Sequence, residues 1–135
     1  MKRVSLLALL LALLLALTMA LCAACGSKTD YRTMEINDAA EMIAADDGHL
    51  LVDVRTQAEF EEKHLPGAIL LPVEDIKDGR LERLPDKDQT ILLYCRTGRR
   101  AEDAAAYLAK KGYTNIYEIG GIIDWKGETV SGSET

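Results

Sequence analysis

The sequence predicts an α/β fold, a sandwich in which a central parallel sheet of about five strands carries helices on both faces. Three observations lead to this prediction. Short apolar runs alternate with helical patterns along the chain, short turns separate them, and one run is apolar almost throughout, as in a strand buried on both faces. After an apolar N-terminal segment about 110 residues remain, which is the size of one domain with one core.

The domain is expected to begin with a short strand and a helix. Polar and apolar residues alternate over residues 31–36, which is typical of a strand. Asn37 is a favourable helix cap, and the apolar residues of 39–44 recur at helical spacing until a polar turn ends the pattern.

The next strand and helix carry the clearest local signals. Residues 50–54 form the nearly continuous apolar run, so we expect a buried strand there. Thr56 and Glu59 have the spacing of a capping box, which predicts a helix over residues 57–63.

The second half of the domain repeats the alternation. Further strands are expected at residues 68–71, 90–94 and 115–119. Between them lie a weakly helical segment at 73–84, which Gly79 breaks and Pro85 ends, and an alanine-rich helix at 101–111. We therefore expect the domain to cover residues 31–126, and the polar residues 127–135 to form a flexible tail.

The first 24 residues have the order of an export signal. Lys2 and Arg3 precede a leucine-rich segment that holds no acidic residue. The sequence Ala23-Ala24-Cys25-Gly26 then resembles the lipobox of bacterial lipoproteins, although Cys22 stands where that pattern prefers leucine. The resemblance implies a lipoprotein signal peptide over residues 1–24, a lipidated Cys25 and a linker over 25–30. An uncleaved membrane anchor and ordinary secretion are the alternatives.

These features imply an extracytoplasmic domain anchored to the cell membrane through two acyl chains. Without Lys2 and Arg3 the chain holds 14 basic and 22 acidic residues, a net charge of about −8. Nucleic acid is not an expected partner, because phosphate contacts need a basic surface. No spacing of His and Cys indicates a metal site, and no cofactor is expected.

The cysteine count makes Cys95 the central candidate. Cys22 leaves with the signal and Cys25 carries the lipid, so Cys95 is expected to be the one free thiol of the mature chain. A thiol outside the reducing cytoplasm is exposed to oxidation, which favours a reactive role over a structural one.

The residues that follow Cys95 can activate its sulfur. Strand 90–94 leads directly into the sequence Cys95-Arg96-Thr97-Gly98-Arg99-Arg100, and then into a helix. In a parallel sheet this position opens into the ligand crevice. Backbone N–H groups, the helix N-terminus and three arginines all favour a thiolate, so we expect a nucleophile directed at an anionic substrate. A buried structural cysteine beside a solvated basic loop is the alternative.

At this point the sequence resembles the rhodanese family of sulfurtransferases over nearly all of residues 31–125. Four segments carry the resemblance: Leu51-Val52-Asp53-Val54-Arg55, Glu59 to Ala68, the Cys95 to Arg100 loop and Gly120 to Trp125. The second departs from the family in one place, because Lys63 stands where the family usually has glycine.

The resemblance implies the rhodanese-like sandwich and a sulfurtransferase of the thiosulfate type. Cys95 would take a sulfane sulfur from a donor such as thiosulfate, form a persulfide and pass the sulfur to cyanide or a thiol. The loop residues Arg96, Thr97, Gly98, Arg99 and Arg100 would bind the donor and stabilise the persulfide. Asp53 and Arg55 would either hold the loop or form a plain structural ion pair.

Two other interpretations compete with this one. A non-enzymatic rhodanese module could carry sulfur or bind a partner. A cysteine phosphatase or arsenate reductase of similar fold is a second possibility, but phosphatases place five residues between cysteine and arginine, whereas four separate Cys95 from Arg100. His64 could serve as a base for Cys95, although a thiolate that is already stabilised needs none.

The lipobox gives the first testable prediction. Labelled fatty acid should enter the wild-type protein in a bacterial host and should not enter Cys25→Ser, because the cysteine sulfur is the acceptor. Equal labelling of the two proteins would rule out the lipoprotein assignment.

Overall fold

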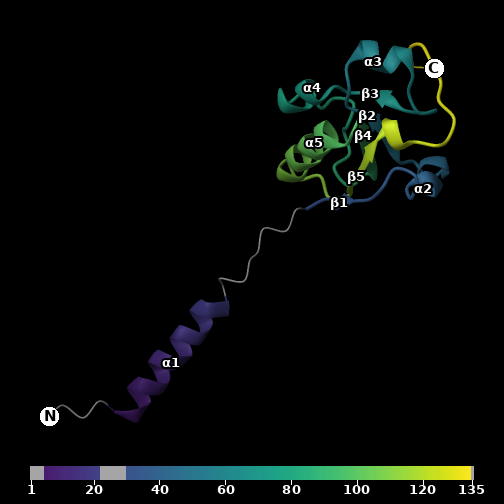
Figure 1. The fold of residues 1–135 in the computed structure, drawn as a ribbon. Helices are drawn as coiled ribbons and strands as arrows, with labels where there is room; N and C mark the ends of the chain where they lie inside the picture. The colour runs from purple at the N-terminus through teal and green to yellow at the C-terminus, as the bar shows by residue number, and fades with distance from the viewer. Residues whose placement is uncertain (1–4, 22–29, 135) are drawn as a thin grey trace.

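A computed structural model describes residues 5–21 and 30–134 (Figure 1). The leucine-rich segment forms helix α1 (Leu6–Leu21), whose described leucines are exposed. No helix in the described part of the chain is long and apolar enough to cross a membrane. Cys25 and most of the predicted linker, like the end of the predicted signal peptide, lie outside the described residues.

Five strands and four α-helices follow α1 in the described part of the chain. The strands are β1 (Arg32–Thr33), β2 (Leu50–Asp53), β3 (Ile69–Leu70), β4 (Ile91–Cys95) and β5 (Ile116–Gly121). The helices are α2 (Ala40–Ala44), α3 (Gln57–Glu62), α4 (Val73–Lys77) and α5 (Arg99–Lys110), and a 3₁₀ turn covers Ile122–Asp124.

The strands form one parallel sheet in the order β1-β5-β4-β2-β3. This confirms the predicted α/β sandwich with five parallel strands. The edge strands β1 and β3 are shorter than predicted, because each pairs with its neighbour over two residues. The central strand β4 is buried over its whole length, and Cys95 is its last residue.

Each face of the sheet has its own core. Helices α4 and α5 cover one face, and α2, α3 and the 3₁₀ turn cover the other (Figure 1). Alternate residues of β4 point to opposite faces, so Leu93 and Cys95 pack toward α5 while Leu92 and Tyr94 pack toward α3. Cys95 therefore lies on the α5 face of the sheet.

Local sequence signals set the start of α3 and the end of α4. Glu59 donates its N–H to the Thr56 hydroxyl, and its carboxylate accepts the N–H of Thr56, as the capping box predicts for α3. Helix α4 ends at Lys77, just before the break that the sequence predicts at Gly79, and no helix continues to residue 84 within the described chain. Gly79 adopts φ +78, a left-handed conformation that ends a helix.

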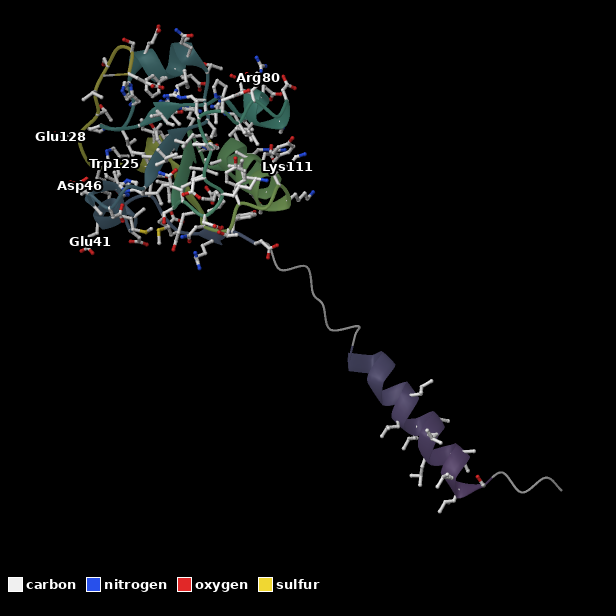
Figure 2. All side chains as sticks on the ribbon, turned by 180° about the vertical axis from the view of Figure 1, so that it is seen from behind. Glu41, Asp46, Arg80, Lys111, Trp125 and Glu128 are labelled. Carbon is white, nitrogen blue, oxygen red and sulfur yellow. The ribbon has the colours of Figure 1, made fainter. Side chains whose placement is uncertain are left out.

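The C-terminal residues also differ from the prediction of a flexible tail over residues 127–135. Trp125 donates from Nε1 to the carbonyl of Glu128 (2.9 Å), and both residues are labelled in Figure 2. Val130 forms a two-bond antiparallel bridge with His64 (2.8 and 2.9 Å). Polar composition did not reveal this segment, because backbone pairing needs no particular side chain.

The last described residue completes this attachment. The Glu134 carboxylate accepts two hydrogen bonds from Arg83, each of 2.6 Å, and a third from the N–H of Leu70. The Arg83 hydrogen bond lowers the pKa of Glu134. The segment from Gly127 to Glu134 therefore belongs to the domain, and its contacts reach the end of α3 and the edge strand β3.

A chain that ends at Thr129 tests this attachment. Because it lacks the His64 bridge and the Arg83 ion pair, its free energy of unfolding should fall by about 2 kcal/mol in urea titrations. Glu134→Gln should give a smaller loss, and the exposed Glu82→Gln serves as the matched control. Equal stability of the shortened and full chains would contradict the structural role of the segment.

Candidate functional site

The candidate site lies where β4 ends and α5 begins. Cys95 is the last residue of β4 and is 1% exposed. The loop turns back over its sulfur, and the N–H of Gly98 donates to Cys95 Sγ at 3.0 Å. Gly98 has φ +105, which favours glycine, and α5 starts at the next residue. The sulfur thus lies under a backbone donor at the positive end of a helix.

The loop lies directly against the end of β5. A Cβ atom added to Gly121 would stand 2.2 Å from the carbonyl oxygen of Arg96 and 2.6 Å from Cα of Thr97. The same carbonyl accepts the N–H of Ile123 at 3.1 Å. Only glycine fits at position 121, and the backbone beyond it holds the loop in place.

Arg100 connects the loop to α3. Its guanidinium donates to both carboxylate oxygens of Glu59, at 2.8 and 2.9 Å. Hydrogen bonding between the two side chains is the main reason why the pKa of Glu59 is lowered to about 2 and the pKa of Arg100 is raised. The nearby Cys95 sulfur raises the pKa of Arg100 further.

Asp53 and Arg55 form a buried ion pair beside the site. Arg55 donates from Nε and Nη2 to the Asp53 carboxylate, with a shortest distance of 2.7 Å, and also to the carbonyl of Lys63. Burial alone would lower the pKa of Arg55, but the Asp53 carboxylate outweighs it and the pKa is raised. Within the described residues neither side chain hydrogen-bonds to residues 95–100. The pair holds the chain after α3 to the end of β2.

The other polar loop residues are open to solvent. Arg96, Thr97 and Arg99 are exposed, and Arg96 and Arg99 form no ion pair in the described part of the chain. Two hollows flank the loop. One of about 270 Å³ includes Arg96, and the other of about 420 Å³ includes Thr97, Gly98 and Arg99. A small ligand can therefore approach the loop from either side.

Glu118 is a buried carboxylate next to the loop that sequence analysis did not single out. It is 6% exposed and accepts the N–H of Gly120 at 2.7 Å. A Cβ atom added to Gly98 would lie 3.4 Å from its Oε1. An acidic residue inside an apolar strand, just before Gly120-Gly121, was the signal that could have found it.

Glu59 and Tyr94 also contribute more than their sequence context indicated. Glu59 was recognised as a capping residue, but its contact with Arg100 joins residues 41 positions apart. The Tyr94 hydroxyl accepts the N–H of Leu65 at 3.1 Å, and its ring lies 5.9 Å from the Arg55 guanidinium carbon. Burial raises the pKa of Tyr94, so this phenol stays protonated.

His64 has a packing role in the structure. Its ring stacks on Phe60 with centroids 3.6 Å apart, and its Nδ1 lies 2.8 Å from the Phe60 carbonyl oxygen. The ring is buried on the face of the sheet opposite to Cys95. The structure therefore gives no support to a Cys–His nucleophile and base.

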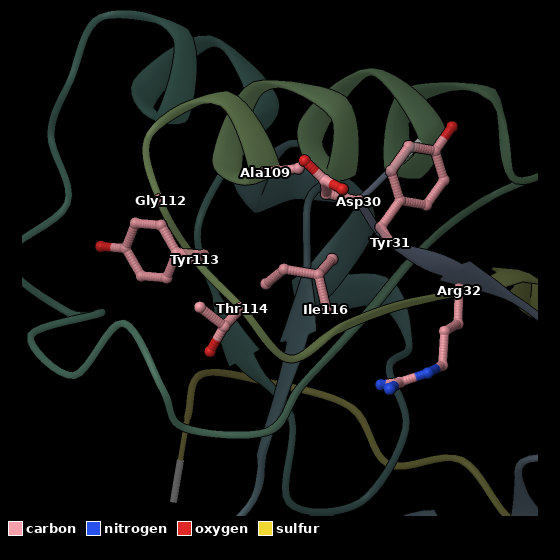
Figure 3. Close-up of a pocket in the computed structure, with 8 residues that line it drawn as sticks. All are labelled: Asp30, Tyr31, Arg32, Ala109, Gly112, Tyr113, Thr114 and Ile116. Atoms are coloured by element: carbon pink, nitrogen blue, oxygen red, sulfur yellow. The ribbon is translucent and has the colours of Figure 1, made fainter. Parts of the chain in front are cut away.

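A separate cavity of about 490 Å³ lies away from this site (Figure 3). Its lining comes from the C-terminal end of α5 and the chain around β1 and the start of β5, including Tyr31, Arg32 and Tyr113. Parallel sheets bind ligands at the carboxyl ends of their strands, and this cavity is at the other end. In residues 5–21 and 30–134 no group of three or more His, Cys, Asp or Glu side chains could hold a metal ion.

Known proteins resemble this chain over the same region. The family described as Rhodanese-like domain matches residues 35–128. A thiosulfate sulfurtransferase, PspE of Escherichia coli (strain K12), is 34% identical over 73 residues, which cover 54% of this chain and 70% of that protein. A sulfurtransferase of Allochromatium vinosum is 39% identical over 87 residues, which cover 64% of this chain and 79% of that protein.

A solved structure shares the fold. The protein described as rhodanese with anions from E. coli superposes with a TM-score of 0.57 at 32% identity, and the match covers 62% of this chain and 99% of that one.

The Glu59–Arg100 pair gives a prediction with a defined pH window. The folded-state pKa of Glu59, about 2, lies below its ordinary value, so the ionised carboxylate stabilises the fold above about pH 4.5. This contribution is lost as the pH falls through about 2. At pH 7, Glu59→Gln should lower the free energy of unfolding by about 1 kcal/mol, and the difference from wild type should shrink between pH 4.5 and 2.

Urea titrations at several pH values measure this difference. Glu62→Gln is the matched control, because the Glu62 side chain is exposed and forms no ion pair within the described residues. A difference between wild type and Glu59→Gln that stays constant down to pH 2 would contradict the ion pair.

Proposed function

This chain belongs to the rhodanese-like domain family, and we propose that it is a sulfurtransferase of the thiosulfate type in which Cys95 carries the sulfur. Its relatives support sulfur transfer in general, since two of them are sulfurtransferases. The contact between the Gly98 N–H and Cys95 Sγ at the start of α5 is the observation that carries the assignment to this residue. That contact stabilises negative charge on the sulfur.

The first half of the reaction loads the sulfur onto the protein. The Cys95 thiolate attacks the outer sulfur of thiosulfate, a sulfur–sulfur bond forms to Cys95, and the sulfur–sulfur bond of thiosulfate breaks. Sulfite leaves with the electron pair, so the products are a Cys95 persulfide anion and sulfite. The Gly98 N–H and the helix N-terminus would stabilise the persulfide, and the loop arginines Arg96, Arg99 and Arg100 would attract the donor.

The second half transfers the sulfur to an acceptor. The lone pair of cyanide, or of a thiolate, attacks the outer sulfur of the persulfide, and the Cys95 thiolate leaves. The products are thiocyanate or a new persulfide, and Cys95 is ready for another cycle. No proton has to move when both reactants are anions, which is consistent with the packing role of His64.

The length of the loop supports sulfur over phosphorus chemistry. Four residues separate Cys95 from Arg100 in this chain. Phosphatases of similar fold have five residues between the cysteine and the arginine, and at that spacing this chain has Ala101. A tighter loop suits a single outer sulfur, whereas a tetrahedral phosphate has three oxygens that need donors.

We also propose that the protein is exported and anchored to the cell membrane as a lipoprotein. The support comes from Lys2, Arg3, the leucine-rich segment and the sequence around Cys25. The acidic domain would then face the extracytoplasmic side, where its donor and acceptor must also occur.

Intact-protein mass measurement tests the persulfide. The full chain with Cys22→Ser and Cys25→Ser, in detergent, keeps Cys95 as its single thiol. After treatment with thiosulfate it should gain one sulfur atom and lose it again with cyanide, and the same chain with Cys95→Ser should gain nothing. Hydrolysis of an aryl phosphate should be negligible. A chain that gains no sulfur would be a binding module, and faster phosphate hydrolysis than sulfur transfer would overturn the loop-length argument.

A further inference from the structure

The two hollows that flank the Cys95 loop differ in charge. The hollow on the β5 side is lined by Glu35, Glu102, Glu118, Asp124 and a single cation, Arg99. The hollow on the α3 side is lined by Arg55, Glu59, Glu62, Lys63 and Arg96, with Ile122 and Ile123. Residues of the Cys95 loop line both hollows, so each is a candidate approach for an anionic donor.

The β5-side hollow disfavours an anion. The pKa of Glu118 is raised, first by burial and then by the nearby carboxylates of Glu102 and Glu35, against the opposing effect of the Gly120 N–H. These carboxylates thus share a negative potential, and a further negative charge would be repelled there.

The α3-side hollow has cations available. Two of its charged groups are already neutralised, because Arg55 is paired with Asp53 and Glu59 is paired with Arg100. Lys63 and Arg96 form no ion pair and no side-chain hydrogen bond within residues 5–21 and 30–134. The carboxylate of Glu62 is the one opposing charge of this lining that has no paired cation in the described chain.

The backbone of Lys63 is held firmly. Its N–H donates to the carbonyl of Glu59 (3.3 Å), and its own carbonyl accepts from Nη2 of Arg55 (2.7 Å). With φ −166 and ψ 146 the residue is extended, so this position requires no glycine. The lysine side chain is therefore attached to a fixed point at the edge of the hollow.

We propose that Lys63 is a donor-binding residue that acts together with Arg96, and that the anionic sulfur donor enters on the α3 side of the loop. The inference rests on the proposed sulfur transfer, and it identifies the sulfur donor as a small dianion such as thiosulfate. Two cations match the two charges of such a donor, and Lys63 adds a charge that the Cys95 loop does not supply.

Steady-state kinetics of the full chain in detergent at low salt test the charge of the hollow. Lys63→Gln should raise the KM for thiosulfate about threefold with little change in kcat, since it weakens an exposed charge interaction. Glu62→Gln should lower the KM, because it removes the opposing charge. Lys110→Gln is the control, since Lys110 is exposed at the far end of α5. An unchanged KM in Lys63→Gln, or a larger KM effect of Glu102→Gln than of Lys63→Gln, would overturn the proposal.

Anion binding without turnover separates this inference from the proposed function. In the ¹⁵N-labelled full chain, sulfate should shift the amide signals of Lys63, Arg96 and Ile123 saturably, and Lys63→Gln should weaken that binding about threefold. If the protein binds sulfate in this way but gains no sulfur from thiosulfate, the donor-binding site is supported and the proposed sulfur transfer is contradicted. Sulfate shifts confined to Glu35 and Glu102, or absent altogether, would overturn the site itself.

Discussion

The contact between the Cys95 loop and Gly121 is the constraint on which the rest of the site depends. The loop backbone at Arg96 and Thr97 comes so close to the end of β5 that no side chain fits between them. Because β4 and β5 are adjacent parallel strands, their carboxyl ends meet, and the loop can rest on its neighbour. Gly98 then turns back over the sulfur, and α5 begins with its positive end at the site. A side chain at position 121 would displace all three together.

Sequence patterns predicted the features that depend on local chemistry. The alternation of strands and helices gave the five-stranded parallel sheet, and the spacing of Thr56 and Glu59 gave the start of α3. The position of Cys95 at the end of a strand predicted that it would meet a helix N-terminus. These features follow from neighbours within a few residues of each other, which is the range that periodicity and capping describe.

Contacts between distant segments could not be predicted in this way. Glu59 reads as a capping residue, and nothing nearby in the sequence indicates that its carboxylate also holds Arg100. The same holds for Glu118 beneath Gly98 and for the bridge between His64 and Val130. Each of these contacts depends on how the sheet brings two distant segments together. The polar composition of residues 127–135 therefore predicts a flexible tail, although the segment pairs with residues far away in the sequence.

The attachment of the C-terminal segment changes what the edge of the sheet offers to other molecules. An edge strand carries free N–H and C=O groups onto which a strand from another chain can be added. At Leu70 of β3 both groups are occupied within the chain, the N–H by the Glu134 carboxylate and the carbonyl by Arg83 at 2.8 Å. A two-residue edge closed by an ion pair is a poor template for intermolecular sheet growth, so protein molecules crowded side by side would resist aggregation through this edge.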